Sequence, residues 1–277
     1  MSENKKGTGA LLWILAIVLT FALVYYQRTT GPTWPISGEV TVGNSKVSFV
    51  LLRSHGGEGG APVVIKVLDK EVTGDISYKR YKSYDEWTTK PMVRNGDNLT
   101  FELPHLPPAG KIEYKIVLHK GNDSVNLSDD PVVLRYKGSV PVGILVPHIF
   151  FMFFSMLFGI RALLEVLAGG DKTEYLAKVI VFSLLIGGLI LGPIVQKYAF
   201  GAYWTGWPFG HDLTDNKTIV MWVFWLIAWL KLRKDPSNKV WPVVAIVVML
   251  AVYLIPHSTM GSEIDYTKQE NKTESVK

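Results

Sequence analysis

Apolar and polar residues alternate in long blocks along this chain, and five of the apolar blocks are long enough to cross a bilayer as helices. They cover residues 10–26, 147–167, 179–196, 218–230 and 240–255. A helix rises about 1.5 Å per residue, so some 20 apolar residues cross a hydrocarbon layer of about 30 Å, with interfacial residues assisting the shorter blocks. The pattern predicts a membrane bundle of five spans.

Positive charge beside the spans predicts their orientation. The segments MSENKK, at residues 1–6, and KLRKDPSNK, at residues 231–239, are rich in Lys and lie an even number of crossings apart. Such segments stay in the cytoplasm. Residues 28–145, loop 197–217 and the tail from residue 256 are then extracytoplasmic, and the plasma (inner) membrane is the expected location.

The first span has two interpretations, a cleaved signal peptide or a permanent anchor. It is longer than an ordinary signal-peptide core, and the following VYYQRTTG has no small-x-small cleavage site. Both features favour an uncleaved anchor.

Short runs of β-branched and aromatic residues fill the polar block between the first and second spans. Six of them predict strands, at residues 46–52, 62–68, 74–81, 98–104, 110–118 and 131–137. Turn segments such as SHGGEGGA, RNGDN and KGNDS separate them, which favours an all-β sandwich. The predicted organisation is an anchor at 1–28, a β-sandwich at 29–140, a four-span bundle at 141–256 with an aromatic outer loop at 197–217, and a polar tail at 257–277.

Within LPPAGKIEYKIVL, a turn is followed by a strand that carries Tyr114. This resembles the tyrosine-corner region of immunoglobulin and fibronectin type III domains. The chain has no cysteine, so the resemblance favours a fibronectin-like variant over the disulfide-bonded antibody type. It implies adhesion or partner binding by analogy with those domains.

Composition narrows the possible functions. Without cysteine there are no thiolate metal sites, cysteine nucleophiles or covalent c-type haem. The net charge of +5 comes largely from residues beside the spans, and no concentrated basic face interleaved with aromatics is present, which argues against nucleic acid. Phosphate-loop and Gly-x-Ser-x-Gly signatures are also missing from the sequence, so an enzyme is less expected than a binding protein.

Two aromatic stretches are candidate partner-binding surfaces. In YKRYKSYDEWT, Tyr81, Tyr84 and Trp87 alternate with cations, and the outer loop carries Trp204 and Trp207. Aromatic rings beside cations bind sugars or proteins, whereas strand alternation would place some rings in the sandwich core. The outer loop equally fits an interfacial aromatic belt.

Three histidines at the predicted outer ends of spans form a candidate metal site. They are His148, His211 and His257, with Asp212 and Glu263 as carboxylate ligands or as acceptors that orient a ring. The set could hold copper or zinc, or supply axial ligands to haem b. The alternative is that these are ordinary interfacial histidines, since no HExxH or other spaced metal motif occurs.

Polar and small residues in the helices suggest structural roles. Arg161 and Glu165, four residues apart, predict an ion pair near the cytoplasmic interface, with a proton relay as the alternative. Gly188 and Gly192 predict close helix packing. Thr214 or Asp215 is expected to cap the fourth span.

These observations leave three hypotheses. The first is a non-enzymatic membrane protein whose outer domain binds a partner or ligand, either on its own membrane anchor or as a subunit of a membrane complex. The second is a metal- or haem-binding redox component, and the third is a small-solute transporter.

Overall fold

The computed structural model describes residues 2–255 and 261–268, with side chains from Gly9 onward, and shows helices and sheets in two compact units. One unit comprises residues 1–32, 140–198 and 202–261, and the other residues 33–139, 199–201 and 262–277. His257 lies outside the described residues.

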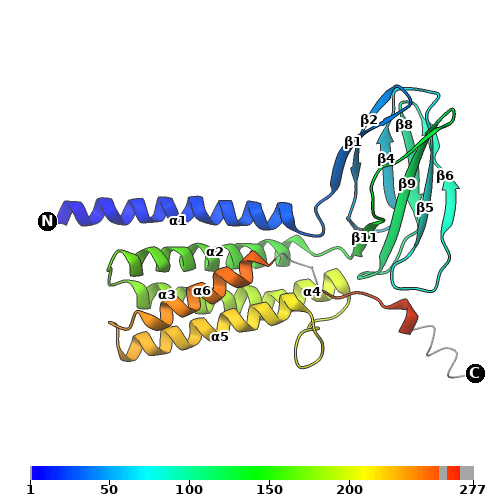
Figure 1. Cartoon of the computed structure of the whole chain (residues 1–277). Helices are drawn as coiled ribbons and strands as arrows, with labels where there is room; N and C mark the ends of the chain where they lie inside the picture. The colour runs from blue at the N-terminus through cyan, green and yellow to red at the C-terminus, as the bar shows by residue number, and fades with distance from the viewer. Residues whose placement is uncertain (1, 256–260, 269–277) are drawn as a thin grey trace, which may run out of the picture. The chain divides into compact units, whose positions relative to one another are not determined.

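The first unit is a helical bundle (Figure 1). Its helices are α1 (Ser2–Thr30), α2 (Val142–Leu167), α3 (Thr173–Leu184), the π-helical segment η1 (Leu185–Leu191), α4 (Gly192–Phe200), α5 (Leu213–Lys234) and α6 (Val240–Leu254). Within the described residues, three stretches are long and apolar enough to cross a membrane: Gly9–Thr30, Val142–Leu167 and Thr173–Phe200. Val240–Leu254 is apolar but shorter. These helices indicate a membrane protein.

The second helix begins earlier than Pro147, where the sequence placed its start. The Pro141 carbonyl accepts from Ile144 N and Leu145 N, at 2.9 and 3.0 Å, and starts the helix there. Residues 142–146 are already apolar, and Pro147, near the N-terminal end of the helix, removes only one backbone hydrogen-bond donor.

The bundle core surrounds Trp225 of α5, whose side chain is fully buried. Its indole N–H donates to Met249 Sδ of α6 at 3.2 Å. Helix α5 also packs against α3, and α6 against α2, so both belong to the same hydrophobic core.

Two adjacent glycines of η1 allow close helix packing. A Cβ on Gly187 would lie 2.7 Å from Phe151 Cβ of α2, and one on Gly188 would lie 2.5 Å from Thr218 Cγ2 of α5. A Cβ on Gly192 would meet nothing closer than 3.6 Å. The tight pair is therefore Gly187 and Gly188, and the predicted pairing of Gly188 with Gly192 is wrong because the π-helical turn changes which residues share a face.

The second unit is built of β-strands (Figure 1). They are β1 (Ile36–Val42), β2 (Ser45–Leu51), β3 (Ser54–Gly56), β4 (Ala61–Lys66), β5 (Thr73–Arg80), β6 (Thr88–Pro91), β7 (Val93–Asn95), β8 (Asn98–Leu103), β9 (Lys111–Lys120), β10 (Asp123–Asn126) and β11 (Val132–Lys137). One sheet has the order β3-β11-β9-β5-β6, with β10 beside β9. Another has the order β4-β8-β7, and β1 and β2 form a hairpin.

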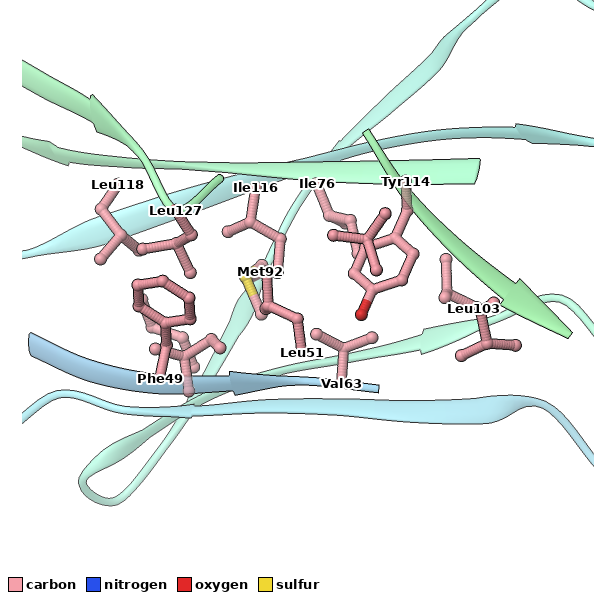
Figure 2. Packing of buried hydrophobic residues seen from close by; sticks show 14 of the residues in the cluster. Phe49, Leu51, Val63, Ile76, Met92, Leu103, Tyr114, Ile116, Leu118 and Leu127 are labelled. Carbon is pink, nitrogen blue, oxygen red and sulfur yellow. The ribbon is translucent and has the colours of Figure 1, made fainter. Parts of the chain in front are cut away.

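The core of this unit lies between strand layers that face each other. Figure 2 shows Tyr114, Ile116 and Leu118 of β9 pointing toward Phe49 and Leu51 of β2. On β9 the burial alternates because successive side chains point to opposite faces.

Tyr114 is fully buried, but its hydrogen bond is not that of a tyrosine corner. Its hydroxyl donates to the Leu52 carbonyl at 2.9 Å, 62 residues away along the chain. A tyrosine corner bonds to backbone only a few residues upstream. Here the hydroxyl instead links β9 to the segment that follows β2.

Candidate functional site

The connection between β5 and β6 is held in a defined shape by one ion pair. Arg80, the last residue of β5, donates from Nε to Asp85 Oδ2 at 2.8 Å and from Nη2 to Asp85 Oδ1 at 2.6 Å. These bonds from Arg80 hold the pKa of Asp85 below its ordinary value. Ser83 reinforces the turn by donating to the Arg80 carbonyl at 2.7 Å. A bidentate pair fixes orientation as well as distance, so the loop is preorganised.

The aromatic residues of this stretch divide between core and surface. Tyr78 lies 5.7 Å from Phe101, ring to ring, and packs against the sandwich core. Tyr84 is 65% exposed, while Tyr81 and Trp87 are partly exposed. Strand alternation therefore accounts for Tyr78 alone.

Cations flank the two partly exposed rings. Trp87 has Lys79 Nζ at 5.4 Å and Lys115 Nζ at 5.0 Å from its ring centroid. Tyr81 has Lys111 Nζ at 5.4 Å and Lys82 Nζ at 5.7 Å. We call Tyr81, Tyr84 and Trp87, with these four lysines, the β5–β6 surface.

The C-terminal tail lies against the same unit. Glu263 accepts hydrogen bonds from Lys82 Nζ and Lys111 Nζ through its two carboxylate oxygens. Burial raises the pKa of Glu263, but the two lysines outweigh it and hold the pKa below the ordinary value. The Glu263 bond in turn raises the pKa of Lys82. Glu263 is thus engaged by two ammonium groups, which the sequence-based assignment to a metal site did not anticipate.

In the helical unit, the loop before α5 is fastened to that helix by buried carboxylates. Asp215 Oδ2 accepts from Thr205 N at 2.7 Å, Gly206 N at 2.9 Å and Gln196 Nε2 at 3.2 Å. Asp212 caps α5 by accepting from Thr214 N at 2.8 Å. The cap is therefore Asp212 rather than Thr214 or Asp215, because Asp215 is already within the helix and faces the loop.

This anchored loop presents aromatic side chains to the surroundings. Trp207 is 70% exposed and Phe209 is 83% exposed, although Trp207 N is fixed by Asn216 Oδ1 at 2.7 Å. Trp204 is partly exposed, and its indole donates to the Trp207 carbonyl at 3.1 Å. Exposed rings on a fixed backbone fit both a lipid interface and a protein contact.

The structure places two of the three histidines of the predicted metal site. His148 Nδ1 lies 2.8 Å from the Gly187 carbonyl, which can only accept, so Nδ1 carries the proton and neutral His148 has its lone pair on Nε2. His211 is exposed in the loop. Within residues 2–255 and 261–268, no three His, Asp or Glu side chains lie close enough together to hold a metal ion. With His257 undescribed, the site of copper, zinc or haem b stays a prediction.

The predicted helix ion pair is present. Arg161 Nη2 lies 2.6 Å from Glu165 Oε2, and both side chains are buried. Glu165 also accepts from Lys172 N at 3.1 Å, so it joins α2 to the start of α3. These contacts give the pair a structural role.

Comparisons with known proteins find no match to a family model, to a curated protein or to a solved structure.

Proposed function

We propose that this protein is a non-enzymatic membrane protein whose immunoglobulin-like sandwich, held outside the cytoplasm by five spans, binds a partner protein through the β5–β6 surface. The helical bundle anchors the sandwich and joins a membrane complex through its aromatic loop. The proposal rests on three lines of support: strand order, the position of the tail and the character of the surface.

The strand order supports an immunoglobulin-like domain. In that fold one sheet contains B, E and D in spatial order B-E-D, and the other contains G, F and C. The order β4-β8-β7 corresponds to B-E-D, and β11-β9-β5 corresponds to G-F-C. Strand β6 then takes the place of the extra strand beside C in variable-type domains.

The tail supports an odd number of spans. Residues 262–268 contact the sandwich, so both lie on one side of the membrane, and the chain between Ser139 and Ser262 must cross an even number of times. Helix α2 and the segment α3–η1–α4 provide two crossings, so α5 and α6 either both cross or both do not. Because both helices pack in the core of the bundle, five spans are the simpler solution.

The observation that carries the proposed function is the pair of cations over Trp87 beside the exposed Tyr84. Binding interfaces are enriched in Trp, Tyr and Arg, and anchoring side chains held rigidly before binding lose less entropy. Lys79 is paired with Glu113 at 3.3 Å, but Lys115 adds positive potential beside Trp87, so an acidic partner surface is favoured over a neutral one.

Photo-crosslinking in native membranes tests this function. A photoreactive phenylalanine analogue replaces Tyr84 or Trp87, and both positions are expected to capture the same protein. Val64 of β4 is the matched control, because it is 49% exposed on the other sheet and should not capture that protein.

A second variant tests whether the two rings act together. Trp87→Ala should reduce capture from position 84 about tenfold or more, as expected for loss of an interface anchor. Capture of lipid alone, or equal capture at positions 64, 84 and 87, would reject the β5–β6 surface as a partner site.

A further inference from the structure

The tail contacts the sandwich in the manner of a bound peptide. Besides the Glu263 ion pairs, Ile264 N donates to the Ala109 carbonyl and Thr267 N to the Lys82 carbonyl, each at 3.2 Å. Recognition of peptides by paired main-chain bonds and charge is common in binding modules.

Side chains at both ends of the tail add to this contact. Arg135 Nη2 donates to the Ser262 carbonyl. At the other end, the Arg80 guanidinium lies 4.6 Å from the ring centroid of Tyr266, which is 6% exposed. A tail of seven described residues thus has a charged contact near its start and an aromatic anchor near its end.

The surface beneath the tail is basic. Arg80, Lys82, Lys111 and Arg135 all approach it, and Glu263 supplies the carboxylate that pairs with two of them. Arg80 is already paired with Asp85, so the preference for an anionic occupant comes from Lys82 and Lys111, whose two ammonium groups both approach the same carboxylate. Lysine and arginine groups arranged around a carboxylate make the stronger, charge-assisted class of hydrogen bond.

We propose that Arg80, Lys82, Lys111 and Arg135 form a binding site for an acidic peptide segment of a partner protein, and that residues 262–268 occupy this site within the same chain. The inference rests on the proposed function, because Lys82 and Lys111 also belong to the β5–β6 surface. The partner segment has the chemistry of residues 263–266 of the tail: a carboxylate, an apolar residue, a second carboxylate and an aromatic ring.

The contact is suited to exchange. The side chain of Lys82 is 44% exposed, so solvent screens its ion pair with Glu263, whereas Lys111 and Glu263 are only 15% and 23% exposed. A tethered segment competes for its site at an effective concentration on the order of millimolar. A partner segment that binds with micromolar affinity can displace the tail when the partner's local concentration is high.

The test uses a fluorescent synthetic peptide of residues 261–269 and the protein in lipid nanodiscs. The peptide should bind a chain that lacks residues 262–277 and should bind the full chain at least about tenfold more weakly, because the tail competes. In the shortened chain, Lys82→Ala with Lys111→Ala should weaken binding about tenfold or more, since two charge-assisted bonds are lost. Lys46→Ala with Lys70→Ala is the matched control, because these exposed lysines pair with Glu39 and Asp97 away from the tail, and it should leave binding unchanged.

A second variant guards against misfolding of the shortened chain. In the full chain, Glu263→Lys places a third ammonium beside Lys82 and Lys111 and should release the tail, so that peptide binding rises toward that of the shortened chain. Equal peptide binding by the full and shortened chains, or no binding at millimolar peptide by either the shortened or the Glu263→Lys chain, would overturn the site.

Another outcome would identify a different occupant. If the full chain forms dimers that dissociate on removal of residues 262–277, the tail binds a second copy, and the assignment to a partner protein is wrong. Crosslinking from positions 84 and 87 is independent of the peptide, so this inference and the proposed function can fail separately.

Discussion

At the scale of single residues, Asp215 has the clearest structural role in the helical unit. One of its oxygens accepts from two consecutive backbone amides, Thr205 N and Gly206 N, and Gly206 is buried. Asp215→Ala should lower the stability of the bundle by about 2 to 4 kcal/mol, because buried amides lose their acceptor. The measurements are the thermal midpoint in detergent and the rate of chymotrypsin cleavage after Phe209, which should rise as the loop is released.

Two variants control this experiment. Asp215→Asn keeps one oxygen acceptor and should fall between the wild type and Asp215→Ala. Asp171→Ala removes an exposed carboxylate near the start of α3 and should change neither readout. Unchanged cleavage in Asp215→Ala would mean that the loop is held by other contacts.

Sequence could identify the residue types at these sites but not their partners. The segment DLTDNK correctly predicted a capped helix start, but the cap is Asp212, which the sequence assigned to a metal site, and the expected cap residue Asp215 binds the loop instead. Both aspartates suit a helix N-terminus, and only the fold of the preceding loop distinguishes them. Likewise, Glu263 is 152 residues from Lys111, so no local pattern could reveal their ion pair.

At the scale of elements, Gly187 and Gly188 set the packing of η1. A Cβ at Gly187 would lie 2.7 Å from Phe151 Cβ and 3.2 Å from the backbone nitrogen of Met152. Gly187→Ala should therefore destabilise the bundle by about 1 to 3 kcal/mol, because helix α2 must shift. Gly188→Ala should also destabilise the bundle, since its Cβ would lie 2.5 Å from Cγ2 of Thr218, a buried and β-branched side chain that has little freedom to move. Thermal unfolding followed by tryptophan fluorescence measures both.

Gly143 of α2 provides a control position, where the change to alanine should not lower the stability of the bundle. An added Cβ there meets nothing within 4 Å, so Gly143→Ala should be neutral or stabilise by up to about 1 kcal/mol through helix propensity. Equal effects at Gly143 and Gly187 would show that helix propensity, and not close packing, governs these positions.

Strong periodic patterns made most elements predictable. The six predicted strands correspond to β2, β4, β5, β8, β9 and β11, each with β-branched or aromatic residues in alternation. The strands that the sequence did not predict are short or exposed. All four residues of β6 (Thr88–Pro91) are exposed, so its sequence lacks the alternation of apolar and polar residues that a half-buried strand shows. Pairing of β3 with β11 in parallel is a long-range contact that only the folded domain defines.

At the scale of the whole molecule, the sequence separated the tail at residues 257–277 from the sandwich, whereas residues 262–268 pack with it. The physical reason is that the tail has too little apolar surface to fold alone and gains order by pairing with Lys82 and Lys111. This contact makes the topology testable, since it requires an even number of crossings between the sandwich and the tail.

Neither α5 nor α6 is among the three described stretches that are long and apolar enough to cross a membrane, and α6 is the shorter of the two. Its 15 residues span about 22 Å at 1.5 Å per residue, less than the hydrocarbon layer. A short span is accommodated by local thinning of the bilayer and by flanking residues, at a modest cost in free energy. The basic residues Lys231, Arg233 and Lys234 in the last turn of α5 favour a cytoplasmic position for the α5–α6 turn.

Cysteine labelling of intact cells tests this arrangement without background, because the chain has no native cysteine. Ser237→Cys, in the exposed turn between α5 and α6, should react with a membrane-impermeant maleimide only after permeabilisation. Lys46→Cys in the sandwich and Lys268→Cys in the tail, both exposed, should react without it. Labelling of position 237 in intact cells, with 46 and 268 also labelled, would indicate three spans with α5 and α6 on the outer side. Labelling of 46 but not 268 would separate the tail from the sandwich and, with it, remove the reason for requiring an even number of crossings.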